Sequence, residues 1–171
     1  MSVDTSTTCA AAIRAFAAGE LATWKGLPDG CTDRDISKVF PGGGDPAGVG
    51  RLSTKRTKAR RYSAADPQQP IEGWFDDADT AFLITWEAPP VVGDVAMLLS
   101  ALGPPEHKLA PGVGDHADAH QWIYASRGLT LWVREHRNEI PRLAVYRPTT
   151  PADYEMRLGG RDKTRYWPRR R

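Results

Sequence analysis

The histidines are the residues of this sequence best suited to hold a metal ion. His116 and His120 stand four positions apart, with Asp115 or Asp118 available as a third ligand. On a helix this spacing places both imidazoles on one face, where a zinc ion could join them. However, Pro111-Gly112-Val113-Gly114 precedes the segment and a strand follows it directly, and residues four apart in an extended chain lie about 13 Å apart. We therefore expect a polar loop here and no metal site.

The cysteines and the acidic clusters do not indicate an activated catalytic centre. Cys9 lies at the start of an alanine-rich helix and Cys31 just before another, and neither has the surroundings of a reactive thiolate. Asp76-Asp77-Ala78-Asp79 is typical of a hairpin turn. The chain has no Gly-x-Gly-x-x-Gly, no phosphate-loop lysine and no His-Glu-x-x-His. We expect a protein without enzymatic activity or cofactor; a small metal or thiol enzyme is the second alternative.

Composition and length describe an ordinary folded chain. It has 171 residues, 26% charged and 40% hydrophobic, which suits one domain or two small ones. No apolar run approaches the roughly 18 residues that a membrane span needs. The first eight residues lack the basic and apolar regions of a secretory signal, so either the protein is not exported or a leader has been removed, and the first is the default expectation. Two cysteines allow at most one disulfide. The sequence thus predicts a cytoplasmic protein without membrane association.

The net charge of +2 conceals two basic segments. Residues 157–171 carry seven basic side chains against one acid, a contribution of +6 that leaves −4 for residues 1–156. A second run, residues 51–61, contains six basic residues and no acid. Together with Tyr166 and Trp167, whose rings could stack on bases, these segments make a nucleic-acid-binding protein the first alternative function. Solvated loops would have the same composition.

The order of the predicted elements occurs twice. Helical spacing over residues 8–25 is followed by a capping box at Thr32 and Asp35 that begins a short helix. A third helix is predicted over residues 92–101, and Thr150, as N-cap, begins a last one that ends at Gly159-Gly160. Strands are predicted at 59–64, 71–76 and 80–87, and again at 121–125, 129–134 and 141–147.

Similar landmarks recur about 60 residues apart. Tyr62 corresponds to Tyr124 and Trp86 to Tyr146 at offsets of 62 and 60 residues. We interpret this as an internal duplication, with one unit at 1–90, a second at 91–148, and a short helix and basic tail at 149–171. The fold class predicted is therefore α+β, with two tandem units of helix and antiparallel sheet packed into one compact protein.

Alternation along the strands predicts which sheet face is left for a partner. Apolar residues on one side would pack on the helices, which leaves a tryptophan flanked by polar groups on each middle strand. Trp74 is flanked by acids and Trp132 by an arginine and a threonine. The predicted partner-binding residues are Trp74, Trp132, Glu72, Asp76, Arg134, Arg142 and Tyr146. The alternative is that these rings form a small second core between the sheet and the tail.

The second unit resembles the beta-lactamase inhibitory protein-like fold. The resemblance is carried by Gln121-Trp122-Ile123-Tyr124, by Leu129-Thr130-Leu131-Trp132-Val133 and by Leu143-Ala144-Val145-Tyr146. The small outer-membrane assembly lipoproteins are similar. This resemblance implies two helix-plus-sheet units that form a concave, aromatic-rich surface clasping a protein. We therefore expect a protein-binding module, an inhibitor or immunity-type protein, whose partner is another protein.

Overall fold

The computed structural model describes residues 5–40, 45–52, 55–62, 71–89, 94–111 and 116–158. No helix in these ranges is long and apolar enough to cross a membrane. Its elements, in chain order, are α1 (Thr5–Ala17), α2 (Asp33–Ser37), β1 (Asp45–Leu52), β2 (Lys55–Tyr62), β3 (Ile71–Phe75), β4 (Ala81–Glu87), α3 (Val95–Leu102), β5 (His107–Leu109), β6 (His120–Tyr124), η2 (Ala125–Arg127), β7 (Leu129–Arg134), η3 (Glu135–Arg137), β8 (Glu139–Tyr146) and α4 (Pro151–Arg157).

The strands form one antiparallel sheet of eight, in the order β1-β2-β3-β4-β8-β7-β6-β5. The predicted α+β class is confirmed. The order is symmetric about the central β4–β8 pair, so the last strand of each half lies at the middle of the sheet. The duplication and its domain boundaries stay a prediction. One of its landmarks is wrong, because Trp86 and Tyr146 pack in different cores on opposite faces of the sheet.

The six predicted strands correspond to β2, β3, β4, β6, β7 and β8, and two more were not predicted. The unpredicted pair, β1 and β5, are the two edges of the sheet. The sequence of β1 contains a proline and two glycines, which are rare in strands, and β5 has only three residues. Pairing with a neighbouring strand, rather than propensity, therefore makes both of them strands.

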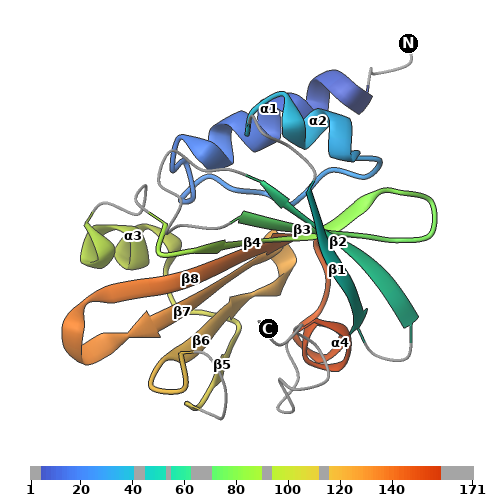
Figure 1. Cartoon of the computed structure of the whole chain (residues 1–171). Coiled ribbons are helices and arrows are strands. Elements are labelled where there is room, and N and C mark those ends of the chain that lie inside the picture. The colour runs from blue at the N-terminus through green and yellow to red at the C-terminus, as the bar shows by residue number, and fades with distance from the viewer. Residues whose placement is uncertain are drawn as a thin grey trace.

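One face of the sheet is covered by α1, α2 and α3, which pack against alternate residues of the strands (Figure 1). The predicted first helix is too long, since α1 ends at Ala17 and Gly19 has a positive φ of 80°. The apolar periodicity beyond it belongs to an irregular segment that runs over the core. There the Trp24 indole donates to the carbonyl of Gly128 at 3.2 Å, and the Leu27 amide donates to that of Tyr146 at 2.9 Å.

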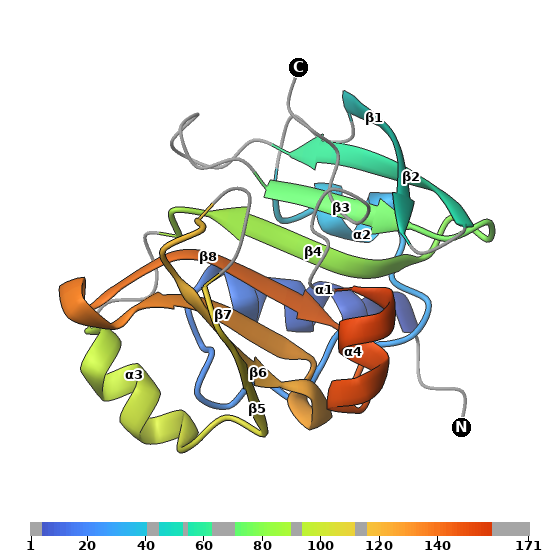
Figure 2. The ribbon, with the colours of Figure 1, turned by 90° about the horizontal axis from the view of Figure 1, so that it is seen from below.

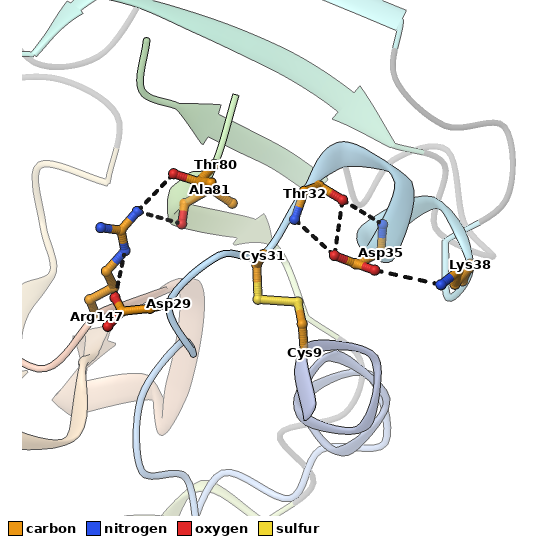
Figure 3. Close-up of a disulfide and its surroundings, with 9 residues drawn as sticks. All are labelled: Cys9, Asp29, Cys31, Thr32, Asp35, Lys38, Thr80, Ala81 and Arg147. Carbon is orange, nitrogen blue, oxygen red and sulfur yellow. Dashed lines mark hydrogen bonds and ion pairs between the residues drawn. A yellow bond between two sulfur atoms is a disulfide. The ribbon is translucent and has the colours of Figure 1, made fainter. Parts of the chain in front are cut away.

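A disulfide joins α1 to the segment before α2, and a capping box begins α2 (Figure 3). Cys9 of α1 is bonded to Cys31, and both cysteines are fully buried. The capping box is confirmed, because the Thr32 hydroxyl accepts from the Asp35 amide while the Asp35 carboxylate accepts from the Thr32 amide at 3.0 Å. The next contact continues into the sheet, where the Ala81 amide donates to the Cys31 carbonyl at 2.7 Å.

The opposite face of the sheet carries a second, smaller core. Figure 2 shows α4 over the ends of β6, β7 and β8, on the side away from α1 and α2. Helix α4 begins as predicted, with the Thr150 hydroxyl accepting from the Asp153 amide at 3.2 Å and proline in its first turn. The second core consists of Ala59, Trp74, Leu83, Leu109, Ala119, Ile123, Ala125, Trp132, Ala144, Tyr146 and Tyr154.

Candidate functional site

The expectation that Trp74, Trp132 and Tyr146 lie on an open face is wrong. All three side chains are 0% exposed, and they belong to the second core. Alternation along the strands did place Trp74 and Trp132 on the same face of the sheet, but it could not show what covers that face. Tyr154 of α4 packs there on Tyr146, with ring centroids 5.0 Å apart. The alternative of a second core, left open by the sequence, describes these rings correctly.

Hydrogen bonds among the buried hydroxyls fasten this core. The hydroxyls of Tyr146 and Thr130 lie 2.9 Å apart, and the Tyr154 hydroxyl donates to the Gln121 side-chain oxygen at 3.0 Å. Burial raises the pKa of both tyrosines far above the usual range. Both hydroxyls therefore take part in the core as neutral hydrogen-bonding groups.

Arg142, another predicted binding residue, lies at the border of the second core. Its guanidinium stacks over the Trp132 ring at 5.5 Å and forms an ion pair with Glu87 on the neighbouring strand β4. The other carboxylate oxygen of Glu87 lies 2.6 Å from Nε2 of His116. The side chains of Arg142, Glu87 and His116 are 10%, 13% and 19% exposed. The structure therefore brings together a half-buried ionic cluster that links β4, β8 and the segment before β6.

The electrostatics of Glu87 follow from this cluster. Burial by itself raises the pKa of Glu87, but the hydrogen bond with His116 and the charge of Arg142 outweigh it and hold the pKa below its usual value. The negative charge of Glu87 is thus stabilised by the fold.

Acid should weaken this part of the fold. Because the pKa of Glu87 is lower in the folded state, its contribution is present above about pH 4.5 and is lost as the pH falls through the folded pKa. We expect the Glu87→Gln variant to be less stable than wild type at neutral pH, by about 1.5–3 kcal/mol. The gap should narrow below pH 4.5. Urea unfolding of wild type and variant between about pH 3 and pH 7, a range that includes the titration of Glu, measures the stability difference and its pH dependence. A stability difference that does not change over this range would contradict the stabilising role of the Glu87 charge.

Arg134 extends the ionic cluster toward solvent. Its Nε donates to Asp118 at 2.8 Å, and a terminal nitrogen donates to Glu139 at 3.3 Å. A second terminal nitrogen lies 3.5 Å from Nδ1 of His116. Both ring nitrogens of His116 are therefore engaged, one by Glu87 and one by Arg134. An imidazole held in this way is poorly placed to bind a metal ion or to act as a general base.

The acidic predicted residues lie on the first half of the sheet. Glu72 forms an ion pair with Arg61 of β2 at 3.3 Å. Asp76 follows β3 directly and accepts hydrogen bonds from the amides of Ala78 and Thr80 and from the Thr80 hydroxyl. Its turn role is therefore confirmed. The structure does not bring Glu72 and Asp76 to the Arg134–Arg142 cluster, so the seven predicted residues do not form one site.

Arg147, which the sequence analysis passed over, joins three parts of the chain (Figure 3). Its guanidinium lies 3.4 Å from Asp29 and 3.3 Å from Asp76, and it donates to the Ala81 carbonyl at 3.4 Å. These partners come from the segment before α2 and from the β3–β4 turn. Arg147 follows β8 directly, so it fixes the end of the central strand pair. Its role is structural.

The chemistry proposed from the cysteines and histidines is not assembled. Both cysteines are consumed by the disulfide. Within the described ranges, no group of three His, Cys, Asp or Glu side chains is arranged to hold a metal ion. The basic tail with Tyr166 and Trp167 lies outside the described residues.

The two edges of the sheet differ in length and in the residues that flank them. At one edge, β5 has three residues, and prolines 105 and 111 lie on either side of it. Lys108 in its middle forms an ion pair with Glu135 and lies over the Trp122 ring at 4.9 Å. Short length, proline and lysine are features that keep a sheet edge from pairing with another chain. The β5 edge is thus protected.

At the other edge, β1 has eight residues, and β2 is its one neighbour among the strands of the described ranges. A register irregularity lies between Pro46 and Gly48, after which Gly48 to Leu52 pair in unbroken register with Ala59 to Lys55. Alternate residues of an edge strand direct their amide and carbonyl groups away from the sheet. These five residues therefore offer a regular, proline-free edge, and the sequence analysis missed it because it predicted no strand there.

Comparison with known proteins gives little further guidance. No protein-family model matches the chain, and no curated protein matches it. A solved structure of a DUF4309 family protein (YjgB) from Bacillus subtilis subsp. subtilis str. 168 is similar over 82% of this chain and 99% of that one, with 14% sequence identity and a TM-score of 0.47. The resemblance to the beta-lactamase inhibitory protein-like fold stays a prediction.

Proposed function

We propose that this chain is a protein-binding module of the inhibitor or immunity type, which holds an extended segment of its target along β1. The observation that carries the proposal is the contrast between the two sheet edges: β5 is short and protected, whereas Gly48 to Leu52 form a regular edge that pairs with no second strand among the described residues. Addition of a strand to such an edge is a common mode of peptide recognition, in which main-chain hydrogen bonds supply affinity.

The proposal replaces the tryptophan face as the binding surface. A partner could reach Trp74 or Trp132 only if the second core opened, because both rings are fully buried. Burial of a large side chain is worth about 1.5–3 kcal/mol, which the partner would have to repay for each ring before gaining affinity. The edge of β1 requires no such opening.

The disulfide supports a location outside the reducing cytoplasm, in place of the cytoplasmic location expected from the sequence. Cys9 and Cys31 are both fully buried and joined. Disulfides persist in secreted and periplasmic proteins and are rare in cytosolic ones. A binding protein that meets its target in an oxidising compartment fits this chemistry.

The edge is tested by proline substitution at neighbouring positions. Val49→Pro and Gly50→Pro each remove one amide donor, and because the donors alternate in direction, one of the two substitutions spares the β1–β2 pairing. We expect that this variant keeps its melting temperature but loses about tenfold or more in affinity for the partner, since outward hydrogen bonds are lost. The variant that breaks the pairing serves as the control for local damage.

The partner for this test is captured from the source organism and then mapped. Amide hydrogen exchange should show that partner binding protects residues 48–52 and leaves 107–109 unchanged. Protection of α3, α4 or β5 instead of β1 would overturn the proposal, as would full affinity in both proline variants.

A further inference from the structure

We infer that the segment received by β1 is acidic; this inference rests on the proposed function and names the chemistry of its partner. The evidence is the charge of the two strands at this edge, which we call the basic ribbon (Asp45–Leu52 and Lys55–Tyr62). The basic ribbon holds six basic residues and one acid, a net charge of +5. The rest of the chain up to residue 156 is acidic, since residues 1–156 sum to −4 and the remainder outside the ribbon therefore sums to −9.

The positive charge is concentrated at the far end of the ribbon. Arg51 and Arg56 are directly paired in register, and Lys55 and Lys58 follow within the same ladder. Like charges directly opposite one another in an antiparallel pair are destabilising. Carboxylates on an added strand would relieve this repulsion, because adjacent strands lie about 4.8 Å apart.

The described acids next to the ribbon lie at its other end. Asp33 is 3.9 Å from Arg60, and Glu72 is 3.3 Å from Arg61. Arg60 and Arg61 occupy the end of β2 that pairs with the middle and start of β3. Both acids lie inward of β2, on α2 and β3, and neither belongs to the open edge. In the paired register, Arg51, Lys55, Arg56 and Lys58 lie at the other end of the ribbon from the residues that these two acids contact, so an added strand at β1 would run beside four basic positions.

A second copy of this chain is a poor occupant for the same reason. Two β1 edges could pair only by placing two ribbons of net charge +5 side by side. At physiological salt, charges closer than the Debye length of about 8 Å are only partly screened, so the two ribbons would repel. An extended segment rich in Asp and Glu could form main-chain hydrogen bonds with the β1 edge and place carboxylates beside its basic residues.

The inference is tested with a matched pair of peptides. One alternates Glu and Val over eight residues, the length of β1, and the other has Gln in place of each Glu. Affinity is measured by calorimetry, and the site by hydrogen exchange at residues 48–52. We expect the Glu peptide to bind about tenfold more tightly than the Gln peptide, and this preference to vanish between about 50 mM and 500 mM NaCl.

Charge variants of the full chain complete the test. Arg51→Gln with Arg56→Gln should reduce affinity for the Glu peptide about tenfold and leave the Gln peptide unaffected. The control is Arg14→Gln with Arg34→Gln, which removes the same charge from exposed positions on α1 and α2. If the double arginine variant shows no melting transition and is therefore unfolded, the double variant Lys55→Gln with Lys58→Gln is used in its place.

The outcomes separate the two proposals. Equal protection of residues 48–52 by both peptides would overturn the acidic inference and leave strand addition standing. The same holds if the double arginine variant binds the Glu peptide as tightly as wild type does. Protection of β1 by neither peptide would overturn both. Concentration-dependent self-association that protects residues 48–52 would identify a second copy as the occupant. Salt-dependent binding of a single-stranded oligonucleotide, without peptide binding, would favour nucleic acid.

Discussion

The Trp132→Ala variant is expected to lose about 3–5 kcal/mol of folding free energy, the usual cost of removing a buried large aromatic ring. Trp132 is fully buried in the second core, with the Arg142 guanidinium over its ring. The cavity left by the indole would also expose the ionic cluster around Glu87 to water. Trp74→Ala should cost a similar amount, because Trp74 is equally buried in the same core.

Urea unfolding followed by circular dichroism measures these losses. Trp132→Phe keeps most of the buried volume and should lose much less folding free energy than Trp132→Ala. Met97→Ala is the control for an apolar residue outside the core, because the Met97 side chain on α3 is 71% exposed. Unchanged stability in Trp132→Ala, combined with loss of partner binding, would return these rings to the role that the sequence predicted for them.

Reduction of the Cys9–Cys31 bond is the second change with a large expected effect. The bond closes a loop between cysteines 22 positions apart, for which restriction of the unfolded chain predicts about 3 kcal/mol of stability. The reduced wild-type protein should unfold at correspondingly lower urea, and Cys9→Ala with Cys31→Ala should behave alike. The comparison of oxidised with reduced wild type isolates the effect of the bond better than the double alanine variant does, because both sulfur atoms remain in the core.

Burial of the disulfide adds a kinetic expectation. Because both cysteines are fully buried, thiol reagents should reduce the bond slowly in the native protein and much faster in urea. Rapid reduction under native conditions, or free thiols that react with a dye in the oxidised protein, would contradict the structure. Either result would also remove the support for a location outside the cytoplasm.

The α+β class and six of the strands could be predicted because local signals specify them. The capping box at Thr32 and the N-cap at Thr150 are formed by side chains within a few residues of the backbone they bind. Alternation along β3 and β7 likewise placed Trp74 and Trp132 on the same face. Such features depend on neighbouring positions, so they can be recognised without knowledge of the rest of the fold.

The candidate site could not be predicted in the same way, because exposure is a property of packing. Alternation separates the two faces of a sheet but does not show whether a helix from the end of the chain covers one of them. Tyr154 of α4 does so here, and it makes a core of residues that look suited to binding. Arg147 went unnoticed for a related reason, since Asp29 and Asp76 are distant from it in sequence.

Local patterns specify the inner strands, the caps of α2 and α4 and the alternation of the strands, because each arises from interactions between near neighbours. The tertiary structure alone decided which strands are edges and which aromatic rings are buried. Strand β1 shows why: its glycines and proline disfavour a strand, yet pairing with β2 supplies the hydrogen bonds that make it one. The same pairing leaves its outer groups open, so the proposed binding edge exists only in the folded sheet.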